Sequence, residues 1–179
     1  MKTESVAFDL VKHMEWADAV AWSSVLASEA AGAHARVQRL LCHIHNVQGG
    51  FLSVWRGESP DFREPGQFPA PSAMMAWGRE RHPRIQEFVS GLGREELEQV
   101  VRLPWAAEVL GAPDLVVQHP TLEQTVFQVI AHSTHHRGQL NALLRSIGAE
   151  PHLTDYIVWI WRGRPAPTWP NPQEAGPAR

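Results

Sequence analysis

The helical spacing of the apolar residues limits the possible folds of this chain more than any other feature. Apolar side chains recur every three or four residues over long segments, which places them on one face of a helix. Four such segments are long, at residues 3–29, 33–56, 72–91 and 121–147. A shorter segment follows, with Thr154 as its expected N-cap and an end near Trp161. This pattern predicts an all-α four-helix bundle with a short fifth helix.

The connection between the second and fourth long helices is long, which predicts a crossover rather than a simple up-and-down path. Residues 57–71 are rich in proline and glycine and are expected to form a loop. Pro83 is expected to kink or split the third helix because it lacks a backbone donor. The runs Val100–Leu103 and Leu115–Gln118 flank a turn-rich stretch, so we expect them to pair as a small hairpin.

The length and composition indicate one soluble globular domain. The chain has 179 residues, enough for one core but few for two. We expect the bundle to occupy residues 1–163 and the proline-rich segment 164–179 to be a flexible tail.

Charge and cysteine content exclude several classes of function. The formal net charge is −3 and no basic run is present, so neither nucleic acid nor a membrane surface is an expected partner. Cys42 is the single cysteine, which rules out an intramolecular disulfide. The first residues lack the apolar core of a signal peptide, and no apolar run is long enough to cross a membrane. These features predict a cytoplasmic protein.

The clearest candidate for chemistry is a pair of histidines in the fourth long helix. His132 and His136 are four residues apart, so their side chains share one helical face. Apolar neighbours on that face predict that both imidazoles point into the bundle. A divalent metal ion would satisfy both rings together. The alternative is that the two rings only hydrogen-bond to each other and to nearby carbonyl groups.

The second long helix offers a third metal ligand. His43 and His45 flank Ile44, which lies at the centre of the apolar stripe. Each histidine is about 100° from that centre on opposite sides, so helical periodicity does not choose between them.

Several segments resemble the DinB family of bacterial four-helix bundles. The resemblance is carried by the run from His132 to Gln139, by His43–Gln48 with Trp55 and Gly57 beyond it, and by Trp16–Asp18. It implies a divalent ion bound by His43, His132 and His136, with open positions for water or substrate. Nickel, zinc, manganese and iron all suit three imidazoles.

The resemblance also implies a range of functions. The family is related to thiol-dependent transferases, so a metal-activated low-molecular-weight thiol attacking a small-molecule electrophile is the first expectation. A metal-dependent hydrolase and a non-catalytic binding protein of the stress response are the alternatives. Members often form homodimers. Arg137, Gln139 and Asp155 are candidates to contact the ligands or substrate, although Arg137 in a structural ion pair and Asp155 in the first turn of its helix are the simpler interpretations.

Overall fold

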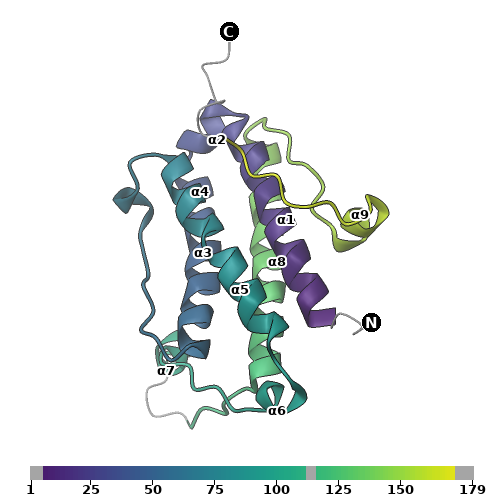
Figure 1. Cartoon of the computed structure of the whole chain (residues 1–179). Coiled ribbons are helices and arrows are strands. Elements are labelled where there is room, and N and C mark those ends of the chain that lie inside the picture. Colours follow the sequence, from purple (N-terminus) through teal and green to yellow (C-terminus); the bar gives the residue numbers. More distant parts are fainter. Residues whose placement is uncertain (1–5, 112–115, 172–179) are drawn as a thin grey trace.

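The computed structural model describes residues 6–111 and 116–171, and three long helices dominate this part of the chain (Figure 1). They are α1 (Val6–Leu26), α3 (Ala35–Trp55) and α8 (Leu122–Ser146). A fourth, broken helix consists of α4 (Pro71–Arg79) and α5 (Arg81–Ser90) and packs across α1 and α3. The all-α four-helix bundle expected from the sequence is confirmed.

A layer of polar residues separates two of the apolar clusters in the interior of the bundle. One cluster includes Trp22, Leu41 and Leu140, and the other includes Phe51 and Val129. Each of the four bundle helices contributes to both clusters. Between them, at mid-length of the helices, lie buried polar side chains: Asp18, His45, Gln48, His82, Ser133 and Arg137. The core is therefore interrupted at one height by hydrogen-bonding groups.

The helix boundaries follow the local signals with some differences. A short helix, α2 (Glu29–Ala33), follows α1 because the Ser28 side chain caps it. The broken helix begins at Pro71 and not after a Ser72 cap, since proline suits the first turn. The expected split occurs at Glu80, which leaves Pro83 within the first turn of α5, where a missing N–H removes no helical bond.

The predicted small hairpin is wrong for the residues that the structure describes. Val100 forms an isolated antiparallel bridge with Thr121, and no described strand continues it. Pro120 accepts a hydrogen bond from the Val101 backbone but has no N–H to extend the ladder. Leu115 lies outside the described residues. The long connections instead contain three short helices: η1 (Pro65–Gln67), α6 (Arg94–Leu97) and α7 (Ala106–Val109).

The two ends of α8 agree with the sequence. Thr121 and Gln124 form the expected capping box, and Gly148 takes a positive φ of 80° just after the helix. The short helix α9 (Tyr156–Trp161) has Asp155 rather than Thr154 at its N-cap position. Thr154 instead uses its carbonyl oxygen to accept a hydrogen bond from His13, which fixes the start of α9 against α1.

The proline-rich segment after α9 makes contacts as far as the structure describes it. The Trp159 indole donates to the Pro165 carbonyl, and the Trp169 indole donates to Glu15 of α1. Such contacts differ from those expected of a flexible tail over residues 164–171. Residues 172–179 lie outside the described residues, so the domain boundary at residue 163 stays a prediction. No described helix is both long and apolar enough to span a membrane.

Candidate metal centre and the cavity beside it

Three histidines from two helices meet at the edge of the bundle. The Nε2 atom of His132 lies 3.1 Å from Nε2 of His136 and 3.1 Å from Nε2 of His43. The first pair is set by the four-residue spacing on α8, and His43 is brought in because α3 packs along α8. The structure thus brings together all three residues that the sequence comparison implied as ligands.

The position of this cluster differs from the sequence expectation in one respect. His43 is exposed, and His132 and His136 are half-buried, so the cluster lies at the surface of the groove between the helices. The residues of α8 that point fully into the core are their neighbours Ser133 and Arg137. The prediction placed the inward face of α8 about one residue off because it assumed that only apolar residues fill that face.

Gln139 fixes the orientation of the His136 ring. Its side-chain oxygen lies 2.9 Å from His136 Nδ1, and its amide nitrogen lies 3.0 Å from His135 Nε2. An amide oxygen only accepts hydrogen bonds, so His136 Nδ1 carries the proton. The neutral ring then directs the lone pair of Nε2 toward the other two histidines. This is the tautomer that a metal ligand needs, held by a neighbour on the same helix.

The surroundings favour neutral imidazoles. Burial and the neighbouring His136 lower the pKa of His43, and burial followed by the same neighbour lowers the pKa of His132 to about 4. These rings therefore keep their lone pairs at neutral pH. His132 Nε2 is close enough to the other two Nε2 atoms for the rings to share hydrogen bonds or to bind one cation between them.

The donor set fits a divalent metal ion. Ligand nitrogens about 2.0–2.1 Å from one ion, at angles of about 90–109°, lie roughly 2.9–3.4 Å apart. The two Nε2 separations of 3.1 Å fall in that range. His132 Nδ1 is buried without a hydrogen-bond partner among the described residues, so the interaction of this ring is directed through Nε2.

Comparison with known proteins agrees with this geometry. The sequence model of the DinB family matches residues 9–165, which is most of the chain. The chain belongs to the DinB family. A search of curated proteins found no match. Family membership and the histidine cluster together fit a metal-binding DinB protein.

Helical periodicity left the choice between His43 and His45 open, and His43 is the one that meets His132 and His136 in this DinB bundle. His45 is fully buried and lies away from the edge of the bundle. Its Nε2 accepts a hydrogen bond from the Trp22 indole at 2.9 Å, and its Nδ1 donates to the Gln48 side-chain oxygen at 3.0 Å. Both ring nitrogens are therefore already used, and His45 belongs to the polar layer inside the bundle.

Of the three further candidates, only Gln139 contacts the histidine cluster. Arg137 points inward and donates to Asp18 at 2.7 Å, which is the structural ion pair that the sequence suggested. Asp155 precedes α9 and lines a separate pocket beside His13. Cys42, although next to His43, donates to the Arg63 carbonyl, and burial raises its thiol pKa to about 11, so it is not a nucleophile.

The polar layer was not predicted as a unit. Gln48 donates to Asp18 at 2.7 Å and to Ser133 at 3.1 Å, and Asp18 Oδ2 lies 3.3 Å from His82 Nε2. Burial alone would raise the pKa of Asp18, but the Arg137 guanidinium, His82 and His45 together outweigh burial and hold the pKa far below its usual range. These bonds join α1, α3, α5 and α8 directly behind the metal centre. The only sequence signal is polar residues at core-facing positions of amphipathic helices.

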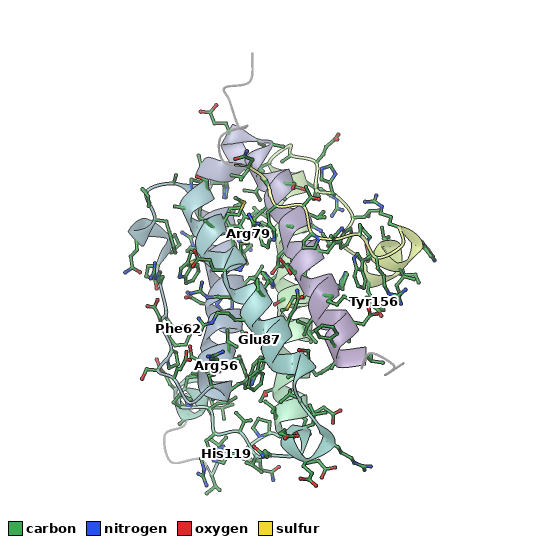
Figure 2. The ribbon with its side chains drawn as sticks, viewed as in Figure 1. Arg56, Phe62, Arg79, Glu87, His119 and Tyr156 are labelled. Atoms are coloured by element: carbon green, nitrogen blue, oxygen red, sulfur yellow. The ribbon has the colours of Figure 1, made fainter. Side chains whose placement is uncertain are left out.

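A cavity of about 820 Å³ opens beside the metal centre, lined by His43 and His132. Its other walls come from α3, from the segment around Phe62 on the side of the bundle (Figure 2), and from the segment around α7. Most of these lining side chains are apolar or aromatic. The candidate metal site therefore borders a largely apolar space that opens to the surface.

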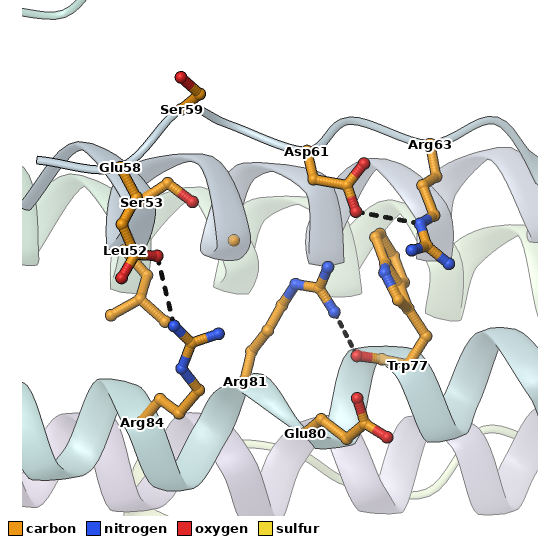
Figure 3. Close-up of a pocket in the computed structure, with 11 residues that line it drawn as sticks. Leu52, Ser53, Glu58, Ser59, Asp61, Arg63, Trp77, Glu80, Arg81 and Arg84 are labelled. Carbon is orange, nitrogen blue, oxygen red and sulfur yellow. Dashed lines mark hydrogen bonds and ion pairs between the residues drawn. The ribbon is translucent and has the colours of Figure 1, made fainter. Parts of the chain in front are cut away.

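A second, smaller cleft of about 320 Å³ lies between α3, α5 and the loop after α3 (Figure 3). Its charged side chains balance one another, because Arg63 pairs with Asp61 and Arg84 pairs with Glu58. Arg81 stacks on the Trp77 ring, 3.7 Å from its centroid, and donates to the Trp77 carbonyl. No described histidine lines this cleft, so it is separate from the candidate metal centre.

Proposed function

We propose that this DinB-family protein binds one divalent metal ion through His43, His132 and His136 and activates a low-molecular-weight thiol for transfer to an electrophile. The observation that carries the proposal is the meeting of three imidazoles, at the edge of the bundle and beside a large cavity. A surface location leaves room for exchangeable ligands, which a catalytic ion requires and a purely structural one does not.

A bound divalent ion would lower the pKa of a coordinated thiol or water, so that a nucleophile forms at neutral pH. The protein's own residues then have defined tasks. Gln139 holds the His136 ring in orientation, and the apolar cavity wall admits the electrophile. In the transfer, the thiolate sulfur forms a bond to the electrophilic carbon, the leaving group departs with its electron pair, and the thiol proton passes to solvent.

Metal-dependent hydrolysis is the second candidate. Glu108 favours it, because this residue is the one carboxylate among the described residues that line the cavity. A carboxylate can serve as general base for an attacking water. The Glu108→Gln variant separates the two chemistries, since it should slow hydrolysis strongly and leave thiol transfer largely unchanged.

The test uses protein loaded with zinc, nickel, manganese or iron, a panel of small thiols, and 1-chloro-2,4-dinitrobenzene as electrophile. Each turnover forms one carbon–sulfur bond and releases chloride, and the absorbance of the dinitrophenyl thioether product measures the rate. We expect a rate that needs metal and that His136→Ala removes, while the exposed control His152→Ala keeps it. Equal rates with and without metal would contradict the transferase, and metal binding without any turnover would favour a non-catalytic binding protein.

A further inference from the structure

We propose that the cavity beside the metal centre binds a neutral, ring-bearing apolar group of the substrate. The role of that group as part of the substrate rests on the proposed function above, whereas binding of an apolar ring to the cavity does not. Because the lining is mostly apolar, we assign this group to the electrophile and not to the thiol.

Aromatic rings form the wall farther from the histidines. The Trp105 ring meets Phe51 at a centroid distance of 5.4 Å and Phe62 at 5.8 Å, both at an interplanar angle of 74°. Such edge-to-face contacts fix the rings in orientation. All three side chains line the cavity, together with Val47, Leu103, Val109 and Leu110. A planar apolar group would find ring surfaces here that are already held in place.

The chain is built to hold Phe62 over this space. A Cβ atom at Gly50 would lie 2.7 Å from the Phe62 ring, so only glycine lets the ring approach α3 this closely. The next residue is tied to the same helix, because Asn46 donates to the Arg63 carbonyl at 2.7 Å and accepts from the Arg63 N–H at 2.8 Å. The position of Phe62 is therefore set by one glycine and by two hydrogen bonds between the Asn46 side chain and the Arg63 backbone.

The mouth of the cavity exposes apolar surface that a ligand would cover. Phe62 is 54% exposed, Leu110 is 55% exposed and Val109 is 75% exposed. Large apolar side chains gathered at one opening mark a binding site more often than single ones do. The cavity is concave and ends at His43 and His132, which suits a small molecule whose reacting atom meets the metal.

The size and charge of the cavity narrow the class of ligand. About 820 Å³ is within the range of pockets that hold drug-sized molecules. Away from the histidines its lining carries one charged side chain, Glu108, so an anionic group placed against that wall would meet a negative charge and no cation. Small thiols that bear several polar or charged groups would lose hydrogen bonds to water there and would gain few from the apolar lining. A neutral aromatic electrophile fits both the shape and the chemistry.

The first experiment needs no metal. N-phenyl-1-naphthylamine, a neutral aromatic probe that fluoresces in apolar surroundings, is titrated into the metal-free full-length protein. We expect Phe62→Ala and Val109→Lys each to weaken binding about tenfold, the scale of one well-placed aromatic contact. Phe127→Ala is the matched control, because Phe127 is 65% exposed on α8 and does not line the cavity. If both cavity variants bind the probe as tightly as wild type and this control, the inference is overturned.

The second experiment links the cavity to the metal centre. Acetohydroxamate and 4-phenylbutanohydroxamate share a metal-binding head, and only the second carries a ring. We expect the ring to tighten binding to the metal-loaded protein at least tenfold, and Phe62→Ala to remove most of that gain. No gain from the ring would refute its place in the cavity. If neither hydroxamate binds the loaded protein, the proposed function fails. The metal-free titration still tests whether the cavity binds an aromatic ring.

Discussion

Two clusters of histidines lie at the same height of this bundle, and they differ in what surrounds their nitrogen atoms. The buried cluster contains His45 and His82 with Asp18, and the edge cluster contains three histidines alone. Both bring possible metal ligands within reach of one another. Ligand types in the right spacing therefore do not distinguish a metal site from a structural one.

Most polar atoms of the buried cluster already have partners. The ring nitrogens of His82 lack a hydrogen bond among the described residues, although its Nε2 lies 3.3 Å from Asp18 Oδ2. The Trp22 indole occupies His45 Nε2, and Arg137 occupies one oxygen of Asp18. A cation placed there would face the Arg137 guanidinium and would need to displace the indole. The edge cluster has the opposite pattern, since its Nε2 atoms face only one another. The guanidinium beside the buried cluster, and the lack of such a cation among the residues that meet at the edge cluster, favour the edge cluster as the candidate metal site.

The largest effect should follow from breaking the buried cluster. We expect Arg137→Met to lower the free energy of unfolding by about 3–5 kcal/mol, because it leaves the Asp18 carboxylate buried without its cation. Urea denaturation of metal-free protein measures this. In the same protein His132→Ala should change the unfolding free energy by less than about 1 kcal/mol, because the ring is half-exposed and unpaired at Nδ1. Comparable losses in both variants would remove the distinction between the clusters.

Lowering the pH should reduce the stability of the protein through the buried cluster. Burial lowers the pKa of His45 to about 4, whereas histidine in the unfolded chain titrates near 6.5. Between these values the unfolded chain takes up a proton that folded His45 does not, so stability falls as the pH falls from 6.5 to 4. The loss attributable to this residue is about 3 kcal/mol.

Urea denaturation of metal-free protein across that pH range measures the slope, and the His45→Asn variant should flatten it. His132 contributes in the same direction because its pKa is also about 4, so His132→Ala serves as the comparison variant. A slope that His45→Asn leaves unchanged would show that the buried ring does not stay neutral in the folded protein.

A smaller effect concerns the ring orientation at the edge cluster. We expect Gln139→Ala to weaken metal binding about 10–100-fold, the usual cost of losing a partner that orients a ligand histidine. Competition with a chromogenic chelator measures the dissociation constant. Gln128→Ala is the control, since Gln128 has the same side chain on the same helix and no described bond to a ligand histidine. Equal affinity in both variants would mean that Gln139 does not orient His136.

The sequence predicted the fold through apolar periodicity, and it predicted the ends of α8 through Thr121 and Gly148. It did not predict the face of α8 that points inward, because Ser133 and Arg137 occupy that face with partners from other helices. Apolar periodicity cannot identify a buried polar residue whose hydrogen-bond partner lies on another helix. The same limit left His43 and His45 equivalent until their partners were known.

The hairpin prediction failed for a related reason. Runs of β-branched and apolar residues such as Val100–Leu103 fit a strand locally, but a ladder needs a partner with free donors. Pro120 lacks a backbone donor, and the chain after Leu103 forms the short helix α7 rather than a turn between two strands. The cavity walls near Trp105 could not be predicted either, because they combine α3, α8 and two connecting segments that are far apart in sequence.

The most direct test of the central claim is the number of metal ions bound per chain, measured by elemental analysis after dialysis against limiting zinc or nickel. We predict one ion for wild type, one for the exposed control variant His152→Ala, one for His82→Ala of the buried cluster, and none for His132→Ala. An ion that persists in His132→Ala, or that disappears in His82→Ala while the protein stays folded, would contradict the assignment of the metal to the edge cluster.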